Sequence, residues 1–266
     1  MPRSLPDCPD PIRTLRADPR WQRIDFVSDV HLHADEPATA SAWLRYLRQV
    51  PADALFILGD LFEVWVGDDD SDPFVQRCVA ALAEVSRRLP VFFVCGNRDF
   101  LAGPGLMQAT GMQALDDPTR LDLGPTRLLL SHGDRLCLDD TDYQEFRAQV
   151  RGAEWQAAFL ARALSERLAL ARALRAQSEQ HKQSQSRWAD VDADAARHWL
   201  RRAQAQVLLH GHTHQPQVHD LGDGWQRWVL SDWQAQATPP RLEVTIWQRQ
   251  AAGDAHHGLS RQPLSA

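Results

Sequence analysis

Short runs of consecutive apolar residues alternate with longer stretches of helical periodicity over the first hundred positions. The runs at 24–28, 54–58 and 91–95 have the length of strands. Between them, residues 38–49 and 74–88 repeat apolar side chains at helical spacing. This order predicts a βαβαβ unit. Because the strands are apolar at nearly every position, it also predicts a sheet covered by helices on both faces.

Strand-like runs return in the second half of the chain, at 127–131, at 206–210 and within 225–247. Residues 147–177 lie between these runs and favour a helix, because they are rich in Ala, Leu, Arg and Glu and contain no proline. We therefore predict that the sheet continues towards the end of the chain and that a helical cap, at about 140–200, is inserted into it.

The two ends of the chain lack such a pattern. Residues 1–22 contain several prolines and charges that break any periodicity, so we predict an irregular extension that is dispensable for chemistry. The 266 residues fit one large α/β domain, at 23–250, followed by a tail at 251–266.

Composition and charge narrow the functional classes. Apolar residues make up 44% of the chain and the net charge is −6, which indicates a globular protein and argues against a nucleic-acid partner. No apolar run is long enough to span a membrane or to form the core of a secretion signal. The four cysteines form no CxxC pair, which favours a reducing, cytoplasmic compartment.

Polar residues follow five of the predicted strands at the point where each strand stops. They lie in the segments SDVHLH, LGDL, CGNRDF, SHGD and HGHTH. Because the carboxyl ends of strands in an α/β sheet meet in one crevice, we expect these side chains to converge. The candidate metal ligands in these segments are Asp29, His31, Asp60, Asn97, His132, His212 and His214.

This donor set combines two aspartates, one asparagine and four histidines, which suits manganese, iron or zinc in an open site. Seven ligands are too many for one catalytic ion. They suit two ions, about 3.5–4 Å apart, that share a carboxylate, for which Asp60 is the candidate. Taken singly, a histidine is more often structural, and a GD or GN dipeptide often marks only a turn. Turn chemistry alone does not explain five such segments in this order.

The five segments resemble the metallophosphoesterases of the calcineurin-like superfamily over about residues 24–247. The resemblance implies a β-sandwich of mixed sheets flanked by helices, with two divalent ions, usually manganese, at the strand ends. It assigns one ion to Asp29, His31, Asp60 and His214. It assigns the other ion to Asp60, Asn97, His132 and His212.

Many members of that family carry a histidine after the asparagine of the third segment, where this chain has Arg98. GNRDF, with the runs at 59–70 and 132–147, resembles those members that hydrolyse the pyrophosphate of a UDP-linked diacylated glucosamine in lipid A synthesis. That resemblance implies attack of metal-activated water at the α-phosphorus. Another metal-dependent phosphodiesterase or a nucleotide pyrophosphatase is the alternative. A scaffold that has lost its metals is disfavoured, because all seven ligands are present.

The resemblance also implies which side chains meet the substrate. Asn97 and Arg98 are the predicted catalytic residues, with Arg98 on a phosphate oxygen; an ion pair with Asp99 is its alternative role. The predicted substrate contacts are Asn97, Arg98, Asp140, Tyr143, Ser178, Lys182 and His212. A solvated acidic loop is the alternative for Asp140 and Tyr143, and Gln185 stands where the family pattern has a lysine.

The predicted cap carries apolar residues at helical spacing, namely Trp155, Phe159, Leu160, Ala163, Leu164, Leu168 and Leu174. Positive charge along the same stretch comes from Arg162, Arg167, Arg172 and Arg175. We predict an apolar groove for acyl chains between these added helices, near the metals. The same pattern fits peripheral contact with the anionic cytoplasmic face of an inner membrane, or a helix packed on its own protein core.

Overall fold

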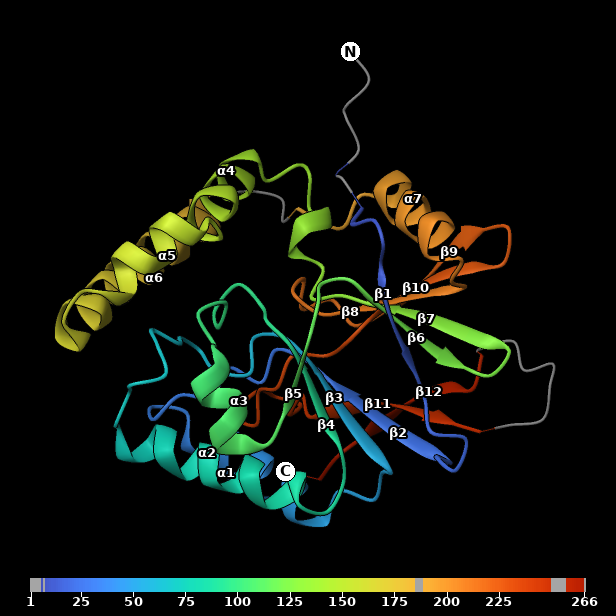
Figure 1. Cartoon of the computed structure of the whole chain (residues 1–266), viewed down its shortest axis with the longest axis horizontal. Helices are drawn as coiled ribbons and strands as arrows, with labels where there is room; N and C mark the ends of the chain where they lie inside the picture. The colour runs from blue at the N-terminus through green and yellow to red at the C-terminus, as the bar shows by residue number, and fades with distance from the viewer. Residues whose placement is uncertain (1–5, 7, 185–188, 250–256, 266) are drawn as a thin grey trace.

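The structure is a computed structural model that describes residues 6, 8–184, 189–249 and 257–265, with only the backbone for 175–184. Two β-sheets pack face to face, and helices cover the outer face of each sheet (Figure 1). The predicted α/β sandwich flanked by helices is confirmed. The expectation of helices on both faces of one sheet is wrong, because the second sheet covers the inner face.

Each sheet is named here by a central strand. The β3 sheet has the order β12 (Leu259–Pro263), β11 (Glu243–Gln248), β2 (Arg23–Val27), β3 (Ala54–Leu58), β4 (Val91–Val94) and β5 (Gln113–Leu115). The β8 sheet has the order β1 (Arg13–Arg16), β6 (Thr119–Leu123), β7 (Thr126–Leu130), β8 (Val207–His210), β10 (Trp225–Val229) and β9 (Val218–Gly222). Strands β2 to β5 are parallel to one another, and so are β7, β8 and β10.

Helices α1 (Pro37–Gln49), α2 (Pro73–Ser86) and α3 (Pro104–Thr110) pack on the β3 sheet. Each of the three begins with a proline, whose missing N–H costs nothing in the first turn. Helix α7 (Ala193–Ala203) packs on the β8 sheet through a buried face that includes Trp199. Asp192 caps the first turn of α7 by accepting a hydrogen bond from a backbone N–H.

The core explains why the central strands are apolar without interruption. Successive residues of a strand point to opposite faces, so in β3 Leu55 and Ile57 face the helices while Phe56 faces the other sheet. The rings of Phe56 and Phe92 stack between the sheets with their centroids 4.6 Å apart. A strand buried on both faces has no position at which a polar side chain meets water.

The two ends of the chain form edge strands, which corrects two expectations. Residues 1–22 are not irregular throughout, since β1 pairs in parallel with β6. The tail at 251–266 also contributes a strand, because β12 pairs with β11 in antiparallel fashion. Both strands are short and have at most one buried residue, so their sequences lack the apolar run that marks the central strands.

The cap consists of α4 (Thr141–Val150), α5 (Ala153–Leu160) and α6 (Leu164–Ser184), which extend as an arm from one side of the sandwich (Figure 1). Gly152 and the turn at 161–163 divide the stretch that the sequence predicted as one helical run. A short 3-10 helix, η1 (Asp134–Leu136), connects β7 to the cap. The last part of the predicted cap, in α7, packs on the β8 sheet instead.

Two arginines fasten the cap to the body of the domain. Arg167 of α6 donates hydrogen bonds to the carbonyl of Val66, at 2.6 Å, and to the Asp69 carboxylate, at 2.8 Å. Its side chain is buried, so it adds no charge to the outer surface of the cap. Arg151, at the end of α4, donates to the carbonyl of Gly96 at 2.8 Å. The cap is therefore tied to the loops that follow β3 and β4.

Candidate metal centre and cleft

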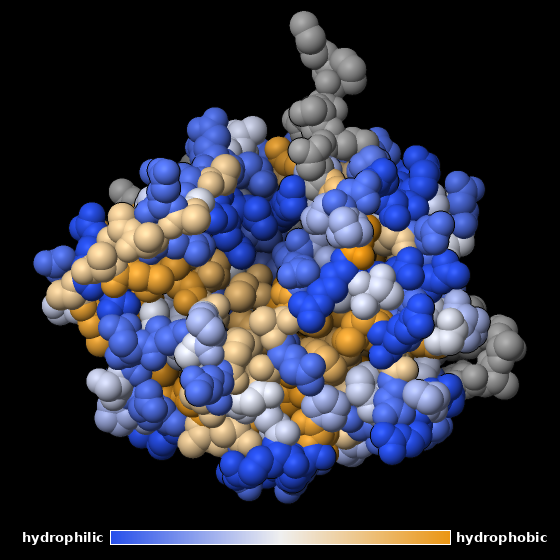
Figure 2. Space-filling view, viewed as in Figure 1, coloured by the Kyte–Doolittle hydropathy of each residue, from blue (hydrophilic) through white to orange (hydrophobic). Residues whose placement is uncertain are grey.

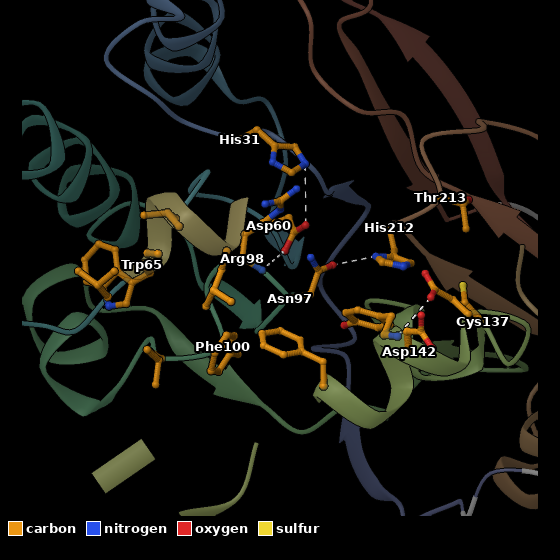
Figure 3. A pocket seen from close by; sticks show the side chains of 18 of the residues that line it. His31, Asp60, Trp65, Asn97, Arg98, Phe100, Cys137, Asp142, His212 and Thr213 are labelled. Atoms are coloured by element: carbon orange, nitrogen blue, oxygen red, sulfur yellow. Dashed lines mark hydrogen bonds and ion pairs between the residues drawn. The ribbon is translucent and has the colours of Figure 1, made fainter. Parts of the chain in front are cut away.

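The seven predicted metal ligands lie together at the carboxyl ends of strands from both sheets. The β3 sheet supplies Asp29 and His31 after β2, Asp60 after β3 and Asn97 after β4. The β8 sheet supplies His132 after β7 and both His212 and His214 after β8. All except Asp29 and His132 line a cavity of about 580 Å³, shown from close by in Figure 3, and those two are buried against the same cluster.

The backbone at five of these positions adopts the left-handed conformation, which L residues rarely occupy. The φ angles are 53° at Asp29, 51° at His31, 52° at Asp60, 67° at His212 and 53° at His214. Such a conformation turns the chain sharply as it leaves a strand. Strained backbone of this kind is concentrated at functional sites.

Glycines beside the ligands allow the turns to approach one another. A Cβ at Gly59, whose φ is 88°, would lie 2.5 Å from Nδ1 of His132. A Cβ at Gly96 would overlap Oδ1 of Asp60. The GD and GN dipeptides are therefore turns, as their alternative interpretation held, but they are turns that bring the ligand side chains into contact.

One cluster of donor atoms forms around Asp29. Its Oδ1 atom lies 3.2 Å from Nε2 of His214 and 3.8 Å from Nε2 of His31. The two Nε2 atoms are themselves 3.2 Å apart. Three donor atoms of the first predicted ligand set thus face one small volume.

Asp60 stands between this cluster and a second one. Its Oδ2 atom lies 3.8 Å from Nε2 of His31, whereas its Oδ1 atom lies 3.6 Å from Nε2 of His132. The backbone N–H of Arg98 donates to the same Oδ1 atom at 2.8 Å and fixes the carboxylate plane. Each oxygen of Asp60 therefore faces the ligand set of a different predicted ion.

The second cluster is organised by Asn97. Its Oδ1 atom lies 2.9 Å from Nε2 of His132 and 2.8 Å from Nδ1 of His212, and Figure 3 shows the amide directed at His212. The backbone N–H of His212 donates to the Asp29 carboxylate at 2.9 Å. The turns after β2, β4, β7 and β8 are thus linked through their side chains.

Acceptors behind two of the imidazoles set which ring nitrogen faces the cavity. Nδ1 of His132 lies 2.9 Å from the carbonyl oxygen of Leu58, and Nδ1 of His31 lies 2.8 Å from Oε2 of Glu63. A proton on each Nδ1 leaves the Nε2 lone pair available to a metal ion. Asp232, which Arg241 holds through two hydrogen bonds, lies 3.8 Å from Nδ1 of His214.

The charges of the cluster fit divalent cations. Burial favours the neutral acid, yet the neighbouring His214 and His31 hold the pKa of Asp29 well below its usual value. Burial opposes charge on His31 too, but the carboxylates around it raise its pKa to about 10, and the same balance raises the pKa of His132 to about 9. Burial and the charge of His132 lower the pKa of His212 to about 3. At neutral pH both imidazoles are therefore cationic, and each carries a proton on a lone pair that a metal ion can take.

Metal binding is therefore expected to release protons. His31 and His132 carry protons at neutral pH, since their pKa values lie at about 10 and about 9, and an ion needs the same lone pairs. Each ion displaces about one proton, so its affinity is expected to rise about tenfold per pH unit between about pH 6.5 and 8.5. His212 adds no proton in this range, because its pKa is about 3.

Calorimetric titration of the metal-free protein with Mn²⁺, in buffers of different protonation enthalpy, counts the protons released. Affinities that do not change with pH over this range would contradict the proposed competition between protons and metal.

Beyond the metal centre, three of the predicted substrate contacts line the cavity, namely Arg98, Asp140 and Tyr143. Nη1 of Arg98 lies 3.7 Å from Oε1 of Glu63, whereas Asp99, its predicted alternative partner, accepts hydrogen bonds from backbone N–H groups of the turns after β3 and β4. Asp140 caps α4 by accepting from the backbone N–H of Tyr143. It is thus part of a helix start.

The ring of Tyr143 faces the cleft, whereas its hydroxyl points towards Asp134. The ring centroid lies 5.8 Å from that of His212, and the hydroxyl donates to the buried carboxylate of Asp134. Ser178 and Lys182 lie on α6, but their side chains are not among those described. Gln185 lies outside the described residues.

An apolar wall continues the cavity away from the metal centre and beneath the cap. It is lined by Val64, Trp65, Val66, Phe100, Leu101, Phe146, Trp155, Phe159, Ala171 and Leu174. Trp155 and Phe159 stack with their centroids 4.9 Å apart, and Phe100 lies 6.2 Å from Trp155. Figure 2 shows apolar surface in the hollow between the cap and the body of the domain.

Sequence reasoning missed Glu63 and Asp232, and it named Asp99 only as an alternative partner of Arg98. Glu63 contacts His31, Asp99 organises two turns, and Asp232 approaches His214. Each lies within four residues of a strand-end glycine, asparagine or serine, as in GDLFE, GNRD and LSD. That proximity is the only signal, because carboxylates are common in loops and a sequence does not reveal what faces them.

The sequence profile of the calcineurin-like phosphoesterase family matches residues 22–216. A UDP-2,3-diacylglucosamine hydrolase of Chromobacterium violaceum is 46% identical over 79% of this chain and 90% of that protein. A protein of the same name from Shewanella pealeana is 44% identical over 80% of this chain and 91% of its own. Another, from Bordetella pertussis, is 42% identical over 84% of this chain and 89% of its own. Among solved structures, an archaeal phosphodiesterase is similar over 91% of this chain and 99% of its own, with 12% identity and a TM-score of 0.46.

Proposed function

This chain belongs to the calcineurin-like phosphoesterase family, and we propose that it hydrolyses the pyrophosphate bond of UDP-2,3-diacylglucosamine to UMP and 2,3-diacylglucosamine 1-phosphate. One feature of the structure carries the proposal. A single cavity has the metal-ligand side chains at one end and an apolar wall at the other. A substrate that joins a pyrophosphate to two acyl chains meets complementary chemistry at both ends.

We assign the cofactor as two Mn²⁺ ions. The first would be held by Asp29, His31, Asp60 and His214, and the second by Asp60, Asn97, His132 and His212. When bound, the two ions lower the pKa of the attacking water and neutralise charge on the phosphoryl oxygens. Water attacks the α-phosphorus, and the bond from that phosphorus to the bridging oxygen breaks.

The protein itself orients the reacting groups. Arg98, at the edge of the cavity beside Asp60, binds a non-bridging phosphate oxygen through its planar guanidinium. Asn97 and His212 contact each other at 2.8 Å, which fixes both side chains next to the same phosphate. The ring of Tyr143 and the carboxylate of Asp140 border the nucleotide and sugar, and Ser178 and Lys182 are proposed contacts from α6.

The assay of first choice follows UMP release from UDP-2,3-diacylglucosamine by purified protein with added Mn²⁺. A chelator provides the metal-free control, and unacylated UDP-sugars and simple phosphodiesters are offered in parallel. We expect manganese-dependent release of UMP from the acylated substrate alone. Turnover of only the soluble esters would support the metal-dependent hydrolysis but refute the assignment of the acylated substrate.

Exposed side chains of the cap suggest where the enzyme meets its acylated substrate. Among the described residues, the exposed large hydrophobic side chains are Leu160, Leu170 and Leu174, and all three lie on α5 and α6. Arg162 and Arg172 are exposed on the same arm. No described helix has the length and apolar character needed to cross a membrane. We place the protein in the cytoplasm, in peripheral contact with the anionic face of the inner membrane.

Replacing Leu160 and Leu170 together with glutamate is expected to reduce binding to anionic lipid vesicles. Each change removes apolar contact area and adds a charge that anionic lipids repel. Co-sedimentation with vesicles that contain phosphatidylglycerol measures the effect, and vesicles of phosphatidylcholine alone provide the control. Equal sedimentation of the variant and the unmodified protein would place membrane contact elsewhere or remove it.

A further inference from the structure

Glu63 lies between two groups of the cleft and belongs to neither predicted ligand set. Its Oε2 atom lies 2.8 Å from Nδ1 of His31, and its Oε1 atom lies 3.7 Å from Nη1 of Arg98. The residue is buried, with 8% of its surface exposed. A single carboxylate thus contacts a candidate metal ligand with one oxygen and a candidate phosphate-binding side chain with the other.

Main-chain hydrogen bonds fix the position of Glu63 relative to His31. The N–H of His31 donates to the carbonyl of Asp60 at 3.0 Å, and the N–H of Glu63 donates to the carbonyl of Leu32 at 3.2 Å. Leu32 and Phe62 form a parallel bridge between the two loops. The loops after β2 and β3 therefore extend the pairing of their strands, so the carboxylate and the imidazole meet in a fixed register.

This contact has consequences for both partners. A carboxylate that accepts a hydrogen bond from Nδ1 keeps the ring in the tautomer whose Nε2 binds metal, and it makes that nitrogen a better donor. The guanidinium of Arg98 carries a long, flexible stem, and a fixed anion on one side restricts where its planar fork can lie. The same acidic group therefore acts on metal binding and on phosphate binding.

We propose that Glu63 is a positioning residue that couples metal binding to phosphate binding. It does so by holding the imidazole of His31 and the guanidinium of Arg98 in one arrangement. The part that concerns Arg98 rests on the proposed function. A glutamine at this position lacks the charge that orients Arg98, and an aspartate lacks the length to span both partners.

The first test measures metal binding alone and needs no substrate. Electron paramagnetic resonance of metal-free protein titrated with Mn²⁺ gives the affinity of Glu63→Gln and Glu63→Asp. Glu243→Gln is the matched control, because Glu243 also pairs with an arginine, Arg261 at 2.6 Å, but lies on β11 outside the cavity. We expect Glu63→Gln to weaken binding about 10- to 100-fold and the control to leave it unchanged.

Glu63→Asp is expected to weaken Mn²⁺ binding in the same direction, and it keeps the test available if the glutamine variant does not fold. Affinities of the folded Glu63 variants equal to that of the Glu243→Gln control would overturn the proposal.

The second test addresses the coupling to Arg98. At saturating Mn²⁺, kcat/KM is compared for Glu63→Gln, Arg98→Ala and the double variant. Because both single changes disturb one arrangement, the double variant is expected to lose less than the product of the two single losses. Losses that simply multiply would overturn the coupling. Absence of UMP release by the unmodified protein would refute the proposed function instead, while the Mn²⁺ titration still tests the contact with His31.

Discussion

Asp60→Ala is expected to lower turnover of UDP-2,3-diacylglucosamine by more than about 10³-fold, on the order of 4 kcal/mol in activation free energy. The reason is the position of its carboxylate, which lies 3.8 Å from Nε2 of His31 and 3.6 Å from Nε2 of His132. Losing it removes one ligand from each ion at once. Turnover at saturating Mn²⁺ and metal content by elemental analysis are measured together, and both are expected to fall.

The backbone at Asp60 requires a second variant. Its φ is 52°, and alanine in the left-handed region costs about 1–2 kcal/mol, so part of the effect of alanine is strain. Asp60→Asn tolerates that conformation and removes only the charge. Asp122→Ala serves as the control, because Asp122 lies on β6 in an ion pair with Arg120 at 2.8 Å, outside the cleft. Near-normal turnover in a folded Asp60 variant would refute the shared-ligand assignment.

Arg98→Ala is expected to lower turnover about 10- to 100-fold while the metal content stays unchanged. A charge-assisted hydrogen bond to phosphate contributes about 1.5–3 kcal/mol, and each 1.36 kcal/mol corresponds to about a tenfold change in rate. Alanine keeps the backbone N–H that donates to Asp60 at 2.8 Å, and Glu63 keeps its 2.8 Å contact with His31, so the metal ligands stay in place. Steady-state kinetics and elemental analysis separate the two effects.

Two further variants sharpen this test. Arg98→Lys retains the positive charge but loses the planar fork, so its turnover is expected to lie between those of the alanine variant and the unmodified enzyme. Arg48→Ala removes an exposed arginine at the end of α1 and serves as the control. Loss of metal from Arg98→Ala would instead give Arg98 a structural role in the turn after β4.

The central strands and the meeting point of the candidate ligands could be predicted because both follow from strong local signals. Runs such as ALFIL and VFFVC are buried on both faces in the structure, so nearly every position in them is apolar. Parallel strands then bring their carboxyl ends together, which is why Asp29, Asp60 and Asn97 lie side by side although thirty or more residues separate each from the next.

Other features left weaker signals. The edge strands β1 and β12 have at most one buried residue each, so their sequences resemble loops. The covering of the β3 sheet by a second sheet is a long-range arrangement, and a strand buried by a sheet has the same apolar sequence as one buried by helices. Glu63 and Asp232 act through contacts that their own sequence neighbourhood does not specify.

The candidate metal ligands come from both sheets, and neither sheet alone provides a full predicted set for either proposed ion. His214 and His132 arrive from the β8 sheet, whereas Asp60 arrives from the β3 sheet. The relative position of these groups is therefore set by the apolar layer between the sheets, where Phe56 and Phe92 stack. Mutational tolerance in that layer is limited by catalysis as well as by folding, so a substitution that the fold accepts can still be lost to natural selection.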